Sequence, residues 1–145
     1  MLTRRLIALI DIKRSNSCSS FWRFCGFAVI EGKAEKRRKG EKMHYNARIK
    51  TVAWLIGRSL LRKGTAYRPI YDAARVEYEA RVDWMKGHKH QAAMRKMIKV
   101  FLAHLWSTWR RMEGLPAPDL YILNNPDYPG HTHYLKPEDY GWPEV

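Results

Sequence analysis

The sequence predicts an all-α fold of four or five helices, and three observations lead to this prediction. The chain has 145 residues, which is enough for one domain with a hydrophobic core. Hydrophobic residues make up 46% of the chain and aromatic residues 12%, a composition far from that of a disordered protein. Several stretches repeat apolar residues at the helical period and end at a glycine. We expect a helix-hairpin-helix-like N-terminal part, a basic loop or small hairpin, and an irregular proline-rich tail.

The first two predicted helices are short. Apolar residues recur at helical spacing over residues 2–10, and the polar stretch that follows ends this element. Ser19 or Ser20 can cap a second helix, since a serine hydroxyl accepts hydrogen bonds from the first free N–H groups. Gly26 stands where a left-handed residue closes a helix. We expect residues 27–31 to form at most a small hairpin.

A longer helix is predicted from Asn46, as its cap, to about Lys63, with Gly64 as its stop. One face of this helix is apolar: Ile49, Val52, Ala53, Ile56, Leu60 and Leu61. The other face is basic: Arg48, Lys50, Arg58, Arg62 and Lys63. A basic amphipathic helix also suits a membrane surface, but this one directly follows a basic loop and is flanked by ordinary globular segments. That context favours nucleic acid over membrane.

The next long helix has Pro69 in its first turn, where the missing N–H costs nothing. Its predicted apolar positions are Ile70, Ala73, Ala74, Val76, Ala80 and Val82. The nearby Tyr67, Tyr71 and Tyr78 are expected to pack in the protein rather than to stack on bases. This assignment places a helix directly before the longest periodic stretch of the chain.

The core helix is predicted over residues 88–113, with Gly114 closing it. Its apolar stripe contains Ala93, Met94, Met97, Ile98, Phe101, Leu102, Leu105, Trp106, Trp109 and Met112. Its cations are expected mostly on the solvated side: Arg95, Lys96, Lys99, Arg110 and Arg111. His104 lies within the apolar stripe, and we expect a hydrogen-bonded histidine there rather than a general base.

The sequence predicts two segments. Residues 1–114 form the helical domain, and residues 115–145 form an irregular tail, rich in proline and tyrosine, that packs on it. Six prolines end the periodicity: Pro116, Pro118, Pro126, Pro129, Pro137 and Pro143. The aromatic residues expected to hold the tail on the surface are Tyr121, Tyr128, Tyr134, Tyr140 and Trp142.

The formal charge of +13 is concentrated near the N-terminus. Residues 1–64 hold 16 Lys or Arg and four acids, a net +12, whereas residues 114–145 carry a net −4. Such a localised field attracts polyanions, although a solvated charge run without a partner is the simpler alternative. The predicted nucleic-acid-binding residues are Lys33, Lys36, Arg37, Arg38, Lys39, Lys42, Arg48 and Lys50.

The sequence favours a binding protein over a catalyst. Cys18 and Cys25 fit neither a disulfide framework nor a paired-cysteine metal site, and the carboxylates are scattered. His88 with His90, and His131 with His133, could make a zinc site only if the two segments met; we weigh capping or surface roles above it. No phosphate loop of the Walker type occurs. We expect no metal site and no cofactor in this chain.

Three blocks of the chain, taken in order, resemble the C-terminal helical domain of insertion-sequence transposases of the IS-one-ten family, which includes the IS-one-sixteen and IS-nine-oh-two types. They are LIALIDI (6–12), SSFWRFCGFAV (19–29) and GKAEKRRKGEKMHYNARIKTVAWLIGRSLLR (32–62). The matching motif residues are Trp22, Phe24 and Gly26, then Asn46, Ile49, Lys50, Trp54, Ile56, Gly57 and Ser59. The stretches 86–116 and 130–142 resemble the terminus of a subgroup, so the resemblance covers the chain from about residue 4 onwards.

The resemblance implies a DNA recombinase whose N-terminal ribonuclease-H-like domain holds four metal-binding acids. The C-terminal domain would contact DNA and guide RNA and, in characterised relatives, supply a nucleophilic serine. This chain contains no such acidic domain and has no serine between Phe27 and Arg58, and Ser59 matches a helix position. The resemblance therefore assigns no catalytic residue here, implies divalent metal only in the catalytic domain, and implies a transposase fragment that is inactive alone.

We therefore expect the DNA-binding C-terminal portion of a transposase, a truncated or split copy that acts in DNA transposition and recombination. Its expected partners are DNA, with structured guide RNA, a second copy or a full-length transposase as further ones, and no membrane. No apolar run reaches the ~18 residues of a membrane span, and a cytoplasmic location is expected. The alternatives are a stand-alone basic nucleic-acid-binding protein, a regulatory protein that pairs with an intact transposase, and an inert degenerate product.

Overall fold

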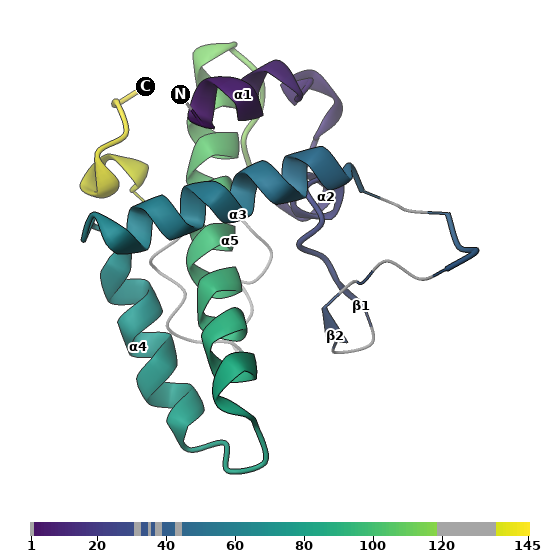
Figure 1. Cartoon of the computed structure of the whole chain (residues 1–145). Coiled ribbons are helices and arrows are strands. Elements are labelled where there is room, and N and C mark those ends of the chain that lie inside the picture. Colours follow the sequence, from purple (N-terminus) through teal and green to yellow (C-terminus); the bar gives the residue numbers. More distant parts are fainter. Residues whose placement is uncertain (1, 31–32, 35, 37–38, 43–44, 119–135) are drawn as a thin grey trace.

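A central helix, α5 (Lys86–Met112), organises the fold, and the helices α2, α3 and α4 pack against it (Figure 1). The structure is a computed structural model that describes residues 2–30, 33–34, 36, 39–42, 45–118 and 136–145. These residues form five α-helices, one two-stranded hairpin and short 3-10 turns, so the all-α prediction is confirmed. Within them, no helix combines the length and the apolar character that a membrane crossing requires.

The N-terminal part contains α1 (Leu2–Ala8), the 3-10 turn η1 (Ile12–Arg14) and α2 (Cys18–Phe24). The predicted cap at Ser19 or Ser20 is wrong, because both residues already lie inside α2. Ser17 is extended and its hydroxyl accepts a hydrogen bond from the N–H of Ser20 at 3.1 Å, which makes Ser17 the cap. Gly26 closes this part with a φ of 85°, as predicted.

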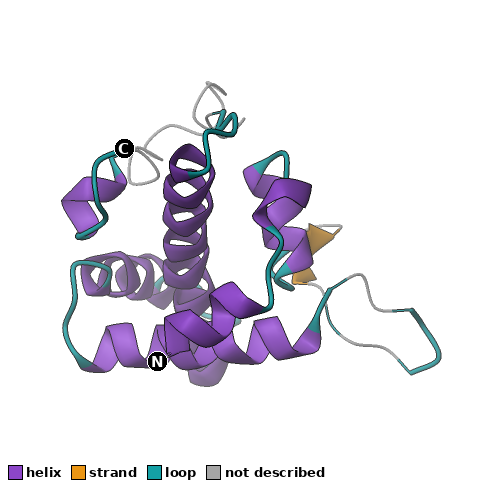
Figure 2. Ribbon diagram, turned by 90° about the horizontal axis from the view of Figure 1, so that it is seen from above, coloured by secondary structure: helices purple, strands orange, loops and turns teal. Residues whose placement is uncertain are grey.

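The predicted small hairpin is confirmed. Strands β1 (Val29–Ile30) and β2 (Lys33–Ala34) pair antiparallel, with Val29 opposite Ala34 and Ile30 opposite Lys33. In both views the hairpin and the described residues 39–42 lie to one side of the helices, near the N-terminal end of α3 (Figures 1 and 2).

Helix α3 (Ala47–Arg62) has the predicted bounds, and its apolar face crosses α5. The Asn46 side chain accepts hydrogen bonds from the N–H groups of Arg48 and Ile49 at 3.0 and 3.4 Å. Gly57 is buried at the crossing, where a Cβ atom would stand 2.6 Å from the Ile98 side chain. The absence of a side chain at Gly57 therefore lets the two helices approach closely.

Helix α4 (Arg68–Glu79) forms a hairpin with α5, and Pro69 lies in its first turn as predicted. Its predicted apolar face is partly wrong. Tyr71 and Ala74 are buried and Ile70 is half-buried, but Ala73, Val76, Ala80 and Val82 are exposed, Val76 at 76% and Val82 at 94%. The tyrosines account for the difference. Tyr71, Ala74 and Tyr78 recur at spacings of three and four residues, and their larger surfaces set the face that meets α5.

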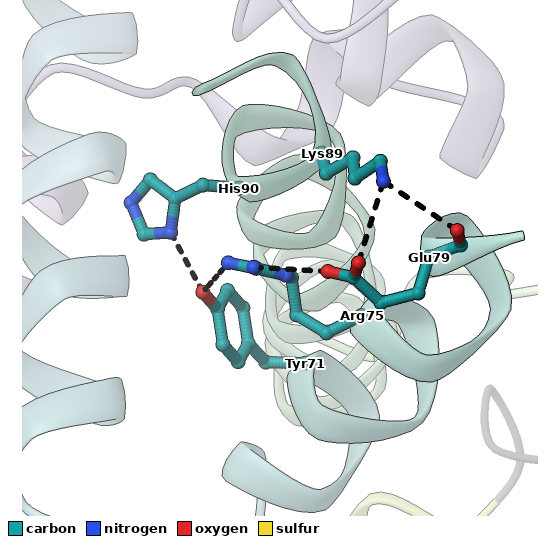
Figure 3. Close-up of polar contacts among 5 residues, drawn as sticks. All are labelled: Tyr71, Arg75, Glu79, Lys89 and His90. Carbon is teal, nitrogen blue, oxygen red and sulfur yellow. Dashed lines mark hydrogen bonds and ion pairs between the residues drawn. The ribbon is translucent and has the colours of Figure 1, made fainter. Parts of the chain in front are cut away.

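A polar network joins α4 to the first turns of α5 (Figure 3). Arg75 donates to the Tyr71 hydroxyl at 3.0 Å and to Glu79 at 3.3 Å, and Lys89 donates to the other Glu79 oxygen at 3.3 Å. The Tyr71 hydroxyl also shares a hydrogen bond of 2.7 Å with Nδ1 of His90. Hydrogen bonds from Arg75 and Lys89 lower the pKa of Glu79. These contacts give Tyr71 and His90 a structural role, which is to join α4 to α5.

The expectation that the cations of α5 lie mostly on its solvated side is wrong: of the five, only Arg111 is exposed, Arg95, Lys96 and Lys99 are half-buried, and Arg110 is 4% exposed. Its guanidinium donates to the carbonyl of Pro116 at 2.6 Å and to that of Ile12 at 2.9 Å, and it lies 5.7 Å from the Trp106 ring centroid. Arg110 therefore joins the N-terminal segment, α5 and the start of the tail. Conversely, Met112 is 64% exposed although it continues the apolar stripe.

The described end of the tail, with the 3-10 turn η4 (Pro137–Tyr140), lies against α5. The Trp142 indole donates to the Tyr67 hydroxyl, which shares a hydrogen bond of 2.7 Å with Nδ1 of His104. His104 is fully buried, so its predicted hydrogen-bonded role is confirmed, as is the packing role of Tyr67. Tyr140 packs on the same cluster, whereas the predicted tail residues Tyr121, Tyr128 and Tyr134 lie outside the described residues.

Candidate nucleic-acid interface

The predicted binding residues lie on the hairpin, the segment after it and the first turn of α3; we call residues 28–45 the basic arm. Of the predicted binding residues, Lys33, Lys36, Lys39, Lys42 and Arg48 are exposed, and Lys50 is half-buried. The other two predicted residues, Arg37 and Arg38, lie outside the described residues. The structure thus brings the described members to one end of α3, at the side of the molecule where the arm lies (Figure 1).

The two ends of the basic arm meet between α2 and α3. The N–H of Asn46 donates to the carbonyl of Phe24 at 3.2 Å, which holds the start of α3 against the end of α2. A Cβ atom on Gly26 would stand 2.8 Å from the Lys50 side chain and 3.0 Å from the Tyr45 ring. Gly26 therefore lets Tyr45 and Lys50 pack over the turn, and these contacts fix the arm's base on the helical core.

No ion pair among the described residues joins Lys33, Lys36, Lys39, Lys42 or Arg48 to a carboxylate. The ion pairs among described residues join Arg14 to Asp11, Arg68 to Asp72, Arg75 and Lys89 to Glu79, and Lys96 to Glu77. None of those pairs involves a described residue between 33 and 63, and the first turn of α3 holds no acid. The basic arm has six Lys or Arg against three Glu, so it keeps an excess of positive charge, to which the N-terminal end of the α3 dipole adds.

A shallow groove of about 380 Å³ runs along the outer face of α3. Its lining residues are Tyr45, Ala47, Lys50, Thr51, Trp54, Leu55 and Arg58, and we call this the α3 groove. From Ala47 onwards they follow spacings of three and four residues, so they form one stripe of the helix. The groove combines two aromatic rings with two cations, and no carboxylate is among its described lining residues. This chemistry suits an anionic ligand that has flat apolar faces.

Neighbouring contacts hold the two aromatic side chains of the α3 groove in place. The Lys50 ammonium lies 4.7 Å from the Tyr45 ring centroid, a cation–π contact. The Trp54 ring lies 6.1 Å from that of Phe27 at an interplanar angle of 31°, and Phe27 is fully buried. Both groove aromatics are half-buried, so they are anchored by the core and also border the groove.

The sequence prediction of the site missed Tyr45, Thr51, Trp54 and Arg58 as a group. The charge pattern indicates Arg48 and Lys50, and Trp54 belongs to the motif series, but neither signal groups these residues with the rest of the groove. The signal that could have found the group is the second stripe of the helix, at positions 47, 50, 51, 54, 55 and 58, which lies opposite the buried Ile49, Ala53 and Ile56. A helix with an aromatic residue on its polar stripe offers a ring that can stack, in addition to cations that can contact phosphates.

The described residues contain no group of three His, Cys, Asp or Glu side chains that could hold a metal ion. His88 stacks on Trp84 at 4.1 Å and His90 bonds to Tyr71, whereas His131 and His133 lie outside the described residues. Cys18 and Cys25 are free and buried. Burial raises the pKa of Cys18 to about 12, so this thiol is a poor nucleophile at neutral pH.

Comparison with protein-family models, with curated proteins and with solved structures finds no match to this chain.

Proposed function

We propose that this protein binds nucleic acid, with DNA as its partner, through the basic arm and the outer face of α3. The observation that carries the proposal is the set of exposed cations at the arm and along α3. Among the described residues, none of these exposed cations forms an ion pair with a carboxylate. The concentration of +12 in residues 1–64 supports it, because each phosphate neutralised by such a cation releases a counterion. The scattered carboxylates and buried thiols favour binding rather than catalysis.

The proposal is tested by the salt dependence of duplex DNA binding for two double variants of equal charge. Arg48→Gln with Arg58→Gln removes two exposed cations of α3, whereas Lys86→Gln with Arg111→Gln removes two exposed cations at the ends of α5. Each lost phosphate contact lowers the log–log salt slope by ~0.9, so the α3 variant should lose about 2 from the slope between roughly 50 and 200 mM salt. The α5 variant should keep the wild-type slope.

Fluorescence anisotropy with one labelled duplex gives both slopes, and thermal melting checks that each variant folds. A flat salt response of the wild-type protein would reject nucleic-acid binding. An equal loss in both double variants would show attraction by net charge alone, and would reject α3 as the binding face.

We further propose that this binding serves an insertion-sequence transposase of the IS-one-ten type. The support is the ordered motif series described above, in which Ile49, Ile56 and Gly57 are core residues of α3 and Lys50 and Trp54 line the α3 groove. The comparisons with known proteins add nothing to this support. The nucleotide sequence upstream of Met1 tests it: a reading frame for an acidic ribonuclease-H-like domain supports the transposase context, whereas unrelated sequence favours a stand-alone binding protein.

A further inference from the structure

We infer that the α3 groove receives an unpaired nucleobase together with its phosphate, so that the protein prefers strands with unpaired bases to a duplex. This inference rests on the proposed function and narrows its ligand. The general attraction for phosphates comes from the basic arm and the exposed arginines, and it does not depend on base pairing. The α3 groove adds a feature that phosphate binding alone does not need, namely two aromatic rings among the cations.

The aromatic residues point to unpaired bases. A base in a duplex is stacked on its neighbours and shows only its edges, so a protein ring cannot stack on its face. In a single strand, a loop or a bulge the base faces are accessible, and stacking on Tyr or Trp tolerates any sequence. Tyr45 and Trp54 border one groove, and both are half-buried rather than covered by the core.

The cations of the groove fit the backbone of such a strand. Lys50 and Arg58 are eight residues apart on α3, which places them about 12 Å apart along the helix axis at 1.5 Å per residue. Leu55 and Ala47 supply apolar surface on the same stripe. A groove that has cations along its length and rings beside them matches the electrostatic and stacking surface of proteins that bind single strands.

The aromatic side chains are held in place before any ligand binds. Trp54 packs on the buried Phe27, Tyr45 lies under the Lys50 ammonium, and both Tyr45 and Lys50 pack over Gly26. Because the rings do not have to be ordered on binding, less conformational entropy is lost when a base stacks on them. This arrangement explains why a glycine with a positive φ stands directly beneath the groove.

The test compares a labelled oligothymidylate, an oligouridylate and a DNA duplex of equal length, by anisotropy at one fixed salt concentration. The two single strands distinguish DNA from RNA as the source of the unpaired base. Tyr45→Leu should weaken single-strand binding by about tenfold or more while duplex binding changes less than twofold. Tyr45→Phe keeps the ring and should bind as the wild type does. Tyr78→Leu, the same substitution on the remote α4, should leave both affinities unchanged.

Ultraviolet cross-linking of the wild-type protein to the single strands provides a second measurement that needs no variant. Mass spectrometry should locate the adduct on Tyr45 or Trp54. Adducts only elsewhere, or equal losses of single-strand and duplex binding in Tyr45→Leu, would overturn the inference. Those results leave the proposed function standing as long as the Arg48 and Arg58 double variant still loses salt-dependent duplex binding. Failure of the wild-type protein to bind any of the three ligands would reject both.

Discussion

Lys99 shows how a single cation can be tolerated in a partly buried position of this fold. Its ammonium lies 4.2 Å from the Trp22 ring centroid, and the neighbouring Arg95 guanidinium lies 5.4 Å from that of Phe27. Burial and the charge of Arg95 lower the pKa of Lys99 from 10.5 to about 8. The aromatic rings therefore compensate only part of the free energy that burying this charge costs.

The lowered pKa of Lys99 predicts a stability that depends on pH. The unfolded chain binds the proton up to pH 10.5 but the folded chain only up to about 8, so the free energy of unfolding rises with pH through this window. Lys99→Met should raise that free energy at pH 7 by on the order of 1 kcal/mol, and the gain should shrink by pH 9.5. Urea unfolding of both proteins at the two pH values measures this. A gain that does not change with pH would contradict a lowered pKa.

At the scale of single elements, the crossing of α3 and α5 depends on Gly57. A Cβ atom there would approach two atoms of Ile98 to 2.6 Å and the Met94 methyl to 3.2 Å. Gly57→Ala should therefore lower the free energy of unfolding by about 1–3 kcal/mol through overpacking, less the ~1 kcal/mol that alanine gains in a helix. Chemical denaturation measures the net loss.

Gly87 provides the matched control for that substitution. It lies in the first turn of α5, it is exposed, and no atom lies within 4 Å of a Cβ placed on it. Gly87→Ala should stabilise the protein by about 0.5–1 kcal/mol, because alanine loses less conformational entropy than glycine in a helix. Equal effects of the two substitutions would show that Gly57 is not required for close packing.

The elements were largely predictable because their signals are local. The Asn46 cap, Gly64, Pro69 and Gly114 mark helix ends through hydrogen bonds and backbone angles that depend on near neighbours. The buried face of α4 was not predictable in this way. Val76 has the same helical period as the core residues, and only the packing of Tyr71 on His90 of α5 and of Tyr78 on Trp84, just before α5, decides which face is covered.

Long-range contacts explain the remaining errors. Arg110 looks like a solvated cation within its helix, but its partners are the carbonyls of Ile12, 98 residues away, and Pro116 beyond the helix end. The α3 groove likewise depends on Gly26 and Phe27 of another segment, which support Tyr45 and Trp54. Charge density alone therefore predicted Lys50 of the α3 groove, but not Arg58 or the aromatic residues.

At the scale of the whole molecule, the charge and the architecture agree. The helical core of α3, α4 and α5 holds a basic arm at one end of α3, and the described ion pairs lie mainly on α4 and α5 (Figures 1 and 2). The net charge of +12 in residues 1–64 is therefore carried by the part of the chain that contains the arm and the outer face of α3. Binding of a polyanion at this region is the central claim.

Amide chemical-shift mapping tests this claim most directly. Isotope-labelled protein is titrated with an unlabelled oligonucleotide at low salt, and every assigned amide reports its own environment. The largest shifts should fall on residues 45–58 and on the hairpin, with little change between residues 80 and 88, where α4 turns into α5. The largest shifts at that turn, or none anywhere at saturating ligand, would contradict it.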